Sequence, residues 1–343
     1  MKQIVTINFL FLAYGLIAAE FPKQWTWFHR KTFTIDEQVE NKCKKEVICS
    51  KVDLPDFTQL VFSWNALRPE KGHFTFYAQV RNAQTKQWSK WHRMIEWGSD
   101  DKQKSFKTEA DGISSYHHVR LEAPETKTAD AFRIKAETSH GAQLSLIKSL
   151  GVNVSNLRNF GTEVNKNFDI PSVYIKGVPR LSQFELTHPR NDGLCSPTSC
   201  TMLMSFLLAK HIDPIDFAEK SFDTGLDKYG SWPFNTAHAF ERADGTVSCA
   251  VLRLNSFKNL YDHLCKKIPV AVSVRGFIKG APRTYDKGHL LLVVGFDAAK
   301  KEVICHDPAV SQAQQAQKRY QLKDFLQAWE RSHRLAYIAE RLL

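Results

Sequence analysis

The sequence predicts a multidomain protein in which an all-β sandwich is followed by an α+β domain. With 343 residues and 43% hydrophobic content, the chain can bury more than one core. Short segments with period-two alternation fill residues 22–155, whereas helical and strand patterns alternate over residues 173–343. Residues 156–172, which are rich in Asn, are predicted to link the two domains.

The chain begins with the features of a secretory leader. A lysine at position 2 precedes an apolar stretch over residues 4–17, and Ala18 and Ala19 supply small residues for cleavage. We expect a signal peptide over residues 1–19, because the stretch is short for a membrane helix. A retained membrane anchor is the alternative. Cleavage would leave no integral membrane span, so the predicted location is secreted, periplasmic or at the cell envelope.

The first domain is predicted from alternating strands. Residues 73–80 place Phe74, Phe76, Ala78 and Val80 on one face, and residues 130–136 alternate in the same way. Short strands separated by turn residues favour a β-sandwich over residues 22–155. Four tryptophans, Trp64, Trp88, Trp91 and Trp97, either pack this sandwich or form a face that binds a glycan or peptide.

The second domain is predicted to contain a central apolar helix and a sheet. Ser196 is the expected N-cap and Pro197 the first helical residue of a helix that runs to about Lys210. Further helices are expected over 213–222, 235–242, 256–267 and 322–331, with strands over 247–252, 270–274, 290–294, 303–306 and 335–339. Residues 230–235 either line a cleft or form a packed turn.

Cys195 is the candidate nucleophile, because the positive end of the following helix stabilises a thiolate. His289, at the start of a buried strand, is the candidate base. If residues 290–306 form a hairpin centred near residue 298, Asp307 lies opposite His289 with Cβ atoms roughly 5 Å apart and orients the imidazole. Cys200 and His306 are rivals, but Cys200 lies inside the helix and alternation turns His306 away.

Gln183 completes this set as an oxyanion donor. Its side-chain amide and the backbone N–H of Cys195 are expected to bind the developing oxyanion, and one such donor contributes on the order of 3 kcal/mol. A thiolate, an imidazole, a carboxylate and an oxyanion donor are the parts that acyl transfer requires.

At these residues the sequence resembles the stand-alone C-39-like (bacteriocin-processing-like) cysteine peptidases of papain-like fold. The resemblance rests on Gln183, the Cys195-Ser-Pro-Thr-Ser199 motif, Gly288-His289 and His306-Asp307-Pro308, and it covers residues 171–343. Ser196 departs from the family's usual glycine, and its side chain is expected to narrow the approach to the thiol. The resemblance implies a papain-like domain over residues 173–343 that hydrolyses peptide bonds through a thioester, with a peptide or protein as substrate.

Two alternatives stay open. A transacylase or amide hydrolase would use the same thioester, and an inactive relative would act only as a surface-binding protein. Neither a cofactor nor a metal is expected, because no Cys/His spacing fits a zinc site.

The other cysteines and the net charge add two expectations. Cys43 and Cys49 are close enough to form a local disulfide, whereas Cys200, Cys249, Cys265 and Cys305 are expected to be buried thiols. The net charge of +11 favours contact with an anionic polymer or the cell envelope. No nucleic-acid-binding motif accompanies the charge, so specific nucleic-acid binding is not expected.

Overall fold

A computed structural model describes residues 24–34, 45–99 and 103–342. The signal peptide expected over residues 1–19 lies outside the described residues. Within the described ranges, no helix has both the length and the apolar character needed to cross a membrane.

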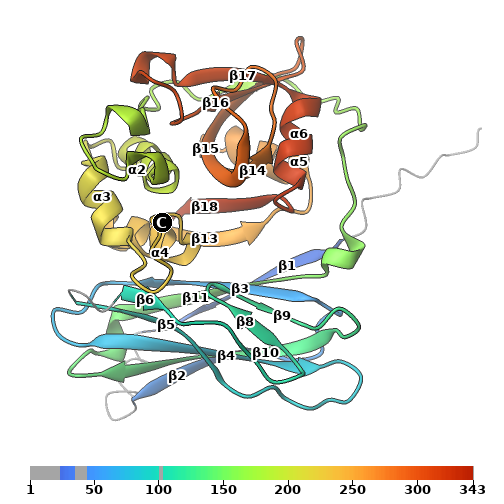
Figure 1. Cartoon of the computed structure of the whole chain (residues 1–343), viewed down its shortest axis with the longest axis vertical. Coiled ribbons are helices and arrows are strands. Elements are labelled where there is room, and N and C mark those ends of the chain that lie inside the picture. Colours follow the sequence, from blue (N-terminus) through green and yellow to red (C-terminus); the bar gives the residue numbers. More distant parts are fainter. Residues whose placement is uncertain (1–23, 35–44, 100–102, 343) are drawn as a thin grey trace, which may run out of the picture.

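The N-terminal unit, which comprises the described residues up to 155, consists of two antiparallel sheets stacked face to face (Figure 1). Alternation explains the stacking, since Phe74, Phe76 and Ala78 of one sheet meet Leu60, Phe62 and Trp64 of the other in a shared core. One sheet has the order β1-β11-β3-β9-β8-β7 and the other the order β2-β10-β4-β5-β6. The strands are β1 Thr26–Thr32, β2 Glu46–Lys51, β3 Gln59–Ala66, β4 His73–Asn82, β5 His92–Gly98, β6 Gln103–Ser105, β7 Glu109–Ala110, β8 Ser115–His117, β9 Arg120–Glu122, β10 Ala129–Ser139 and β11 Ile147–Ser155.

The C-terminal unit, residues 173–342, is an antiparallel sheet with helices on its faces. Its strands follow the order β13-β18-β14-β15-β16-β17, and β12 pairs with β15. The helices are α2 Cys195–Leu208, α3 Pro214–Ser221, α4 Trp232–Arg242, α5 Phe257–Cys265 and α6 Leu322–Glu330. The strands are β12 Val173–Tyr174, β13 Val247–Arg253, β14 Val270–Gly276, β15 Tyr285–Asp297, β16 Glu302–His306, β17 Gln317–Gln321 and β18 Leu335–Arg341.

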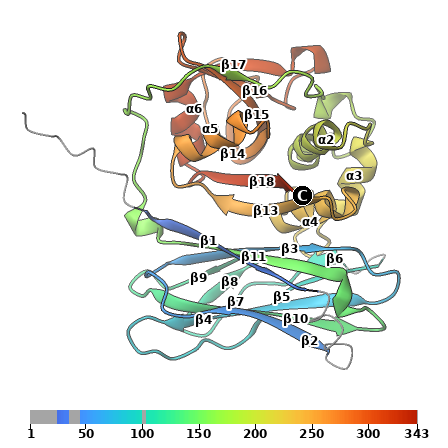
Figure 2. The ribbon, with the colours of Figure 1, turned by 180° about the vertical axis from the view of Figure 1, so that it is seen from behind.

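The segment between the units is packed against the C-terminal unit along one side (Figures 1 and 2). A short 3-10 helix, Leu157–Asn159, follows β11. Glu163 then accepts a hydrogen bond from the backbone N–H of Phe257 at 2.7 Å and lies 3.7 Å from the buried Arg334. These contacts fix the segment against two elements of the C-terminal unit.

The two units share a core through α4, which lies at their boundary (Figure 1). Phe234 and Ala237 belong to the hydrophobic core of the N-terminal unit, and the Phe234 ring meets Trp64 edge-on at 5.7 Å between centroids. The Nε–H of Arg68 donates to both carboxylate oxygens of Glu241 on the same helix, each at 3.1 Å. Residues 230–235 are therefore a packed turn and helix start, one of the two roles expected for them.

Polar side chains of the N-terminal unit cover the edge strand β13. The backbone N–H groups of alternate residues, Cys249, Val251 and Arg253, donate to Asn65, Ser63 and Asn153 at 2.8, 3.3 and 3.0 Å. An open strand edge otherwise exposes such donors to other chains. The interface thus satisfies the outer edge of the C-terminal sheet.

We predict that the core shared through α4 makes Phe234 a major contributor to stability. The Phe234→Ala variant should lower the free energy of unfolding by about 3–5 kcal/mol, because a fully buried ring leaves a cavity. The matched control is Phe277→Ala, since Phe277 is 63% exposed and its loss should change stability by less than about 0.5 kcal/mol. Urea unfolding measures both, and equal losses would contradict the shared core.

Candidate active site

Cys195 is the first residue of α2, and Leu194 occupies the N-cap position. The expectation that Ser196 caps this helix is therefore wrong, since the N–H of Thr198 already bonds to the carbonyl of Leu194 at 3.0 Å. The first N–H groups of a helix have no partner within it, and their dipoles favour an anion nearby. Cys195 thus lies where a thiolate is stabilised.

Two hydroxyl groups fix the first turn of α2 against the sheet. Ser196 Oγ lies 3.0 Å from the hydroxyl of Tyr337 on β18. Ser199 Oγ donates to the carbonyl of Leu290 on β15 at 3.1 Å. Because Ser196 is fully buried in this contact, its side chain points into the fold and does not narrow the approach to Cys195 as expected.

His289 lies within β15, opposite Val274 of β14, and it is buried. Its Nε2 lies 2.8 Å from Asp307 Oδ1, and the ring is close enough to Cys195 to lower the pKa of its thiol. The structure therefore brings the three residues together. The prediction that residues 289 and 307 lie directly opposite each other is wrong. A bulge between Val293 and Gly295 shifts the register of the hairpin, so that His306 pairs with Leu292.

The carboxylate of Asp307 is fully buried and accepts four hydrogen bonds. Oδ1 accepts from His289 and from the backbone N–H of Ala309 at 2.9 Å. Oδ2 accepts from the hydroxyls of Tyr285 and Tyr320 at 2.6 and 2.7 Å. Burial alone would raise the pKa of Asp307, but the positive charge of His289 and these hydrogen bonds lower it to about 2.

Tyr285 and Tyr320 are site residues that the sequence did not reveal. The Tyr285 ring stacks on the His289 ring, with centroids 4.1 Å apart and planes 12° apart. Burial and the neighbouring Asp307 charge raise the pKa of both tyrosines, so each remains a hydrogen-bond donor. Strand alternation would have placed Tyr285 on the face of His289, whereas Tyr320 belongs to β17 and has no local signal.

The charges of Cys195 and His289 stabilise each other. Burial would raise the pKa of the Cys195 thiol, but its hydrogen bond and charge interaction with His289 lower it. Burial would likewise lower the pKa of His289, but Asp307 and then Cys195 raise it to about 9. The geometry therefore favours a thiolate–imidazolium pair near neutral pH.

Gln183 lies in a short 3-10 helix, Gln183–Glu185, and its side chain is buried. Its Nε2 donates to the carbonyls of Asn191 and Asp192 at 2.8 and 2.9 Å. Both amide hydrogens are thus engaged, which differs from the expected donation to an oxyanion. Gln183 instead holds the turn that leads into Cys195.

The rival candidates, Cys200 and His306, do not belong to the group formed by Cys195, His289 and Asp307. Cys200 is buried, and burial raises the pKa of its thiol well above the usual value. His306 faces the carbonyl of Pro179 at 2.8 Å, and burial lowers its pKa to about 4. Cys265 is exposed, so the expectation that it is a buried thiol is wrong. Cys43 lies outside the described residues, and Cys49 is a buried free thiol in the structure, not half of the expected local disulfide.

No group of three or more His, Cys, Asp or Glu residues that could hold a metal ion occurs in the described part of the chain. The chemistry that this site supports by itself is nucleophilic attack by sulfur with proton transfer by imidazole.

One of three comparisons with known proteins places this site in a family. Residues 175–337 match the model of the Peptidase_C39 like family. Among curated proteins, none matches the sequence significantly. A crystal structure from Bacillus anthracis, provisionally assigned as a C39-like peptidase, is similar with 15% identity and a TM-score of 0.39, over 50% of this chain and 99% of that chain. The part of the chain that holds Cys195, His289 and Asp307 therefore belongs to the C39-like peptidase family.

Proposed function

We propose that the protein is an exported cysteine peptidase that hydrolyses peptide bonds through a thioester. The observation that carries this proposal is the grouping of Cys195 with the hydrogen-bonded pair of His289 and Asp307 within the part of the chain that matches the C39-like family. An apolar helix with the cysteine at its start, packed on an antiparallel sheet that carries the histidine and aspartate, supports a papain-like arrangement for this domain. Export rests on the leader predicted over residues 1–19.

The proposed reaction has two steps. The Cys195 thiolate attacks the peptide carbonyl, and His289 donates its proton to the leaving amine as the C–N bond breaks. His289 then takes a proton from water, the hydroxide attacks the thioester, and the C–S bond breaks to release the acid and the thiolate. Since Nε2 of His289 is bound to Asp307, Nδ1 is the nitrogen that exchanges protons.

Oxyanion stabilisation is assigned to the start of α2. The N–H of Cys195 belongs to the helix turn whose donors have no partner within the helix. Gln183 acts by holding residues 191–192 ahead of the nucleophile, and it joins the oxyanion site only if it releases one of the two carbonyls. The choice of oxyanion donors is therefore independent of the roles proposed for Cys195, His289 and Asp307.

The first prediction concerns the nucleophile. On the mature protein, iodoacetamide should modify Cys195 faster near pH 7 than the exposed Cys265, because only Cys195 pairs with an imidazolium. Mass-spectrometric mapping of the modified thiols gives both rates. The Cys195→Ala variant should lose peptide hydrolysis by about 10,000-fold or more, while Cys265→Ala should retain it.

Alkylation of Cys195 no faster than that of Cys265, together with no hydrolysis by the wild-type protein, would support the inactive surface-binding alternative. Hydrolysis that survives in Cys195→Ala would contradict Cys195 as the nucleophile. A product assay with added amines separates hydrolysis from acyl transfer. Acyl-amine products that exceed the acid would identify a transacylase.

The second prediction concerns the pH dependence. Because the pKa of His289 is raised to about 9, kcat/KM should be sustained below that pH and fall as the pH rises through it, when the imidazolium is lost. In Asp307→Asn the carboxylate charge that raises this pKa is gone, so the alkaline limb should move to lower pH. Initial rates measured across the pH range test both the alkaline fall and its shift. An alkaline limb at the same pH in Asp307→Asn and in the wild type would contradict the role of Asp307.

The third prediction concerns the two tyrosines as positioning residues. Tyr285→Phe and Tyr320→Phe each remove a hydrogen bond to a buried charge, worth about 1.5–3 kcal/mol. Because the pKa of Asp307 is lowered from 3.8 to about 2, its contribution to stability is fully present above the ordinary value and is lost as the pH falls through about 2. Each variant should therefore lose more stability at pH 7 than at pH 2.

The matched control is Tyr174→Phe, which removes a hydroxyl bonded to Gln317 at the surface. It should leave stability nearly unchanged at both pH values. In the two buried variants kcat should fall about 10-fold. A loss of stability that is the same at both pH values would show that the tyrosines merely fill space.

A further inference from the structure

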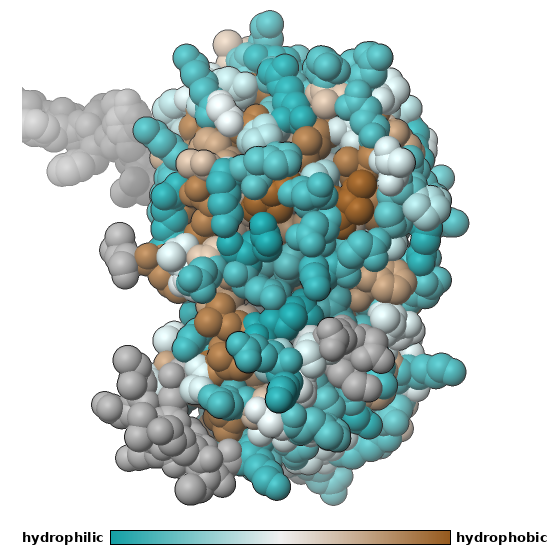
Figure 3. Space-filling model, turned by 90° about the vertical axis from the view of Figure 1, so that its left-hand side faces the viewer, coloured by the Kyte–Doolittle hydropathy of each residue, from teal (hydrophilic) through white to brown (hydrophobic). Residues whose placement is uncertain are grey.

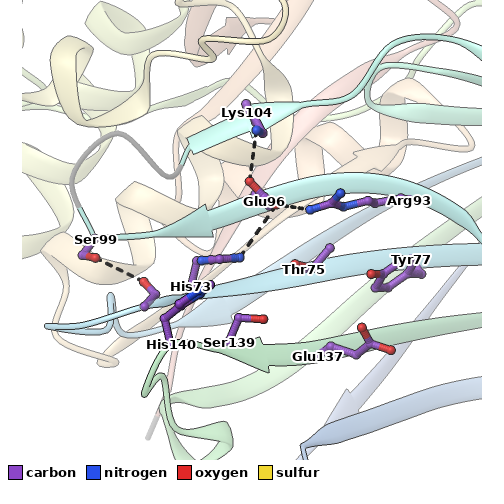
Figure 4. A pocket seen from close by; sticks show the side chains of 11 residues that line it. His73, Thr75, Tyr77, Arg93, Glu96, Ser99, Lys104, Glu137, Ser139 and His140 are labelled. Atoms are coloured by element: carbon purple, nitrogen blue, oxygen red, sulfur yellow. Dashed lines mark hydrogen bonds and ion pairs between the residues drawn. The ribbon is translucent and has the colours of Figure 1, made fainter.

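The outer face of the five-stranded sheet carries a groove with a volume of about 680 Å³ (Figure 4). His73, Thr75 and Tyr77 of β4 line it, while the residues between them, Phe74 and Phe76, point into the core. Glu96 of β5 and Glu137 and Ser139 of β10 also contribute to its surface. The groove therefore runs over three neighbouring central strands and is lined by polar groups.

The groove is held in shape by a buried carboxylate. Glu96 is only 4% exposed, and it lies 3.7 Å from His73 and 3.4 Å from Lys104, with a further hydrogen bond from Arg93. Figure 4 shows these side chains converging on Glu96. Gly72, with φ of +77°, also lines the groove, and a Cβ there would lie 2.1 Å from the carbonyl oxygen of Ser139.

Aromatic side chains extend from Tyr77, in the groove, onto the neighbouring part of this face. Tyr77, Trp88 and Trp91 are each partly exposed, in contrast to Trp64 and Trp97, which are fully buried in the core. Lys135 connects the rings, because its Nζ lies 4.7 Å from the Tyr77 centroid and 5.1 Å from that of Trp91. Of the four tryptophans, two pack the core and two lie on the outer face.

The charges of the groove disfavour a polyanion as its ligand. Arg93 and Lys104 are paired with Glu96, and Lys135 contacts both Glu137 and Glu46. A polyanion needs cations that are free to bind it. The groove instead presents hydrogen-bond acceptors, from its carboxylates and hydroxyls, together with donors, from its hydroxyls and paired cations. This mixture suits a neutral ligand with many hydroxyl groups.

The position of the groove also disfavours an extended peptide. Peptides that join a sheet require a strand edge with free N–H and C=O groups. Here β10, β4 and β5 each have a neighbouring strand on both sides, so their main-chain groups are paired within the sheet. Recognition must come from side chains, and aromatic rings beside paired polar groups match the apolar and hydroxyl faces of a sugar.

We propose that this groove, with Tyr77 in its lining and Trp88 and Trp91 beside it, binds a neutral oligosaccharide built of hexose or N-acetylhexosamine units. Glu137 and Thr75 accept and donate to sugar hydroxyls, and the aromatic rings contact the sugar faces. β4 and β10, which carry most of the groove, belong to the sheet that lies farther from the C-terminal unit (Figures 1 and 2). The bound glycan therefore tethers the protein to a surface and leaves the site at Cys195 accessible.

The test measures binding directly with the full-length mature protein. Cello-, chito- and maltohexaose are titrated calorimetrically, and at least one should bind with a dissociation constant of about 10–100 μM. Tyr77→Ala and Glu137→Ala should weaken that binding at least 10-fold. The control Glu125→Ala changes an exposed glutamate outside the groove and should bind like the wild type. All three variants should retain their thermal midpoint and their peptide hydrolysis.

Two further arms distinguish the source of the glycan. Retention on insoluble cellulose, chitin or starch supports a structural polysaccharide, and retention on an immobilised glycoprotein that is lost after enzymatic deglycosylation supports a protein-linked glycan. The proposal is overturned if no hexaose binds, if the groove variants bind as tightly as Glu125→Ala, or if only dextran sulfate or peptides are retained. Because binding is measured without turnover, this outcome is independent of the peptidase proposal.

Discussion

Burial of the Asp307 carboxylate is the constraint that organises the candidate active site. An ionised carboxylate away from water is strongly unfavourable unless donors replace its hydration. Here His289, Tyr285, Tyr320 and the N–H of Ala309 replace it. These donors come from β15, from β17 and from the turn after β16, so the site forms only when this edge of the sheet is complete. The same charge raises the pKa of His289, and through it favours the thiolate at the start of α2.

The residues with distinctive chemistry could be predicted from the sequence, whereas their supports could not. Cys195, His289 and Asp307 stand out because a thiol before an apolar run and a histidine before a buried strand are unusual local patterns. Tyr320 approaches Asp307 only through the pairing of β16 with β17, which leaves no trace in local spacing. Ser196 was expected to cap α2 on the strength of the following proline, but its contact with Tyr337, 141 residues away in sequence, decides its role.

The same division applies to the fold. Period-two alternation predicted β4 and β10 to within a few residues, since a strand with one buried face carries a strong signal. It could not separate tryptophans of the core from those of the outer face, because Trp88 lies outside any strand and a bulge interrupts the pairing of β4 with β5. The interface between the units was also beyond prediction, since Ser63 and Asn65 resemble ordinary polar strand residues until β13 lies beside them. The side of the molecule that carries α2 and α3 is mostly hydrophilic, with scattered apolar areas (Figure 3). A mostly hydrophilic surface is expected when the interface between the two units is buried inside the molecule.

The cover over β13 has a consequence for how the chain folds during synthesis. Ser63, Asn65 and Asn153 leave the ribosome almost a hundred residues or more before Cys249, Val251 and Arg253, and domains generally fold in the order in which they are made. The acceptors are thus in place when the outermost strand of the second sheet emerges. On that order, the N-terminal unit is folded and ready to cover this strand when it emerges. Its position ahead of the candidate site residues in the chain then favours assembly of the second sheet.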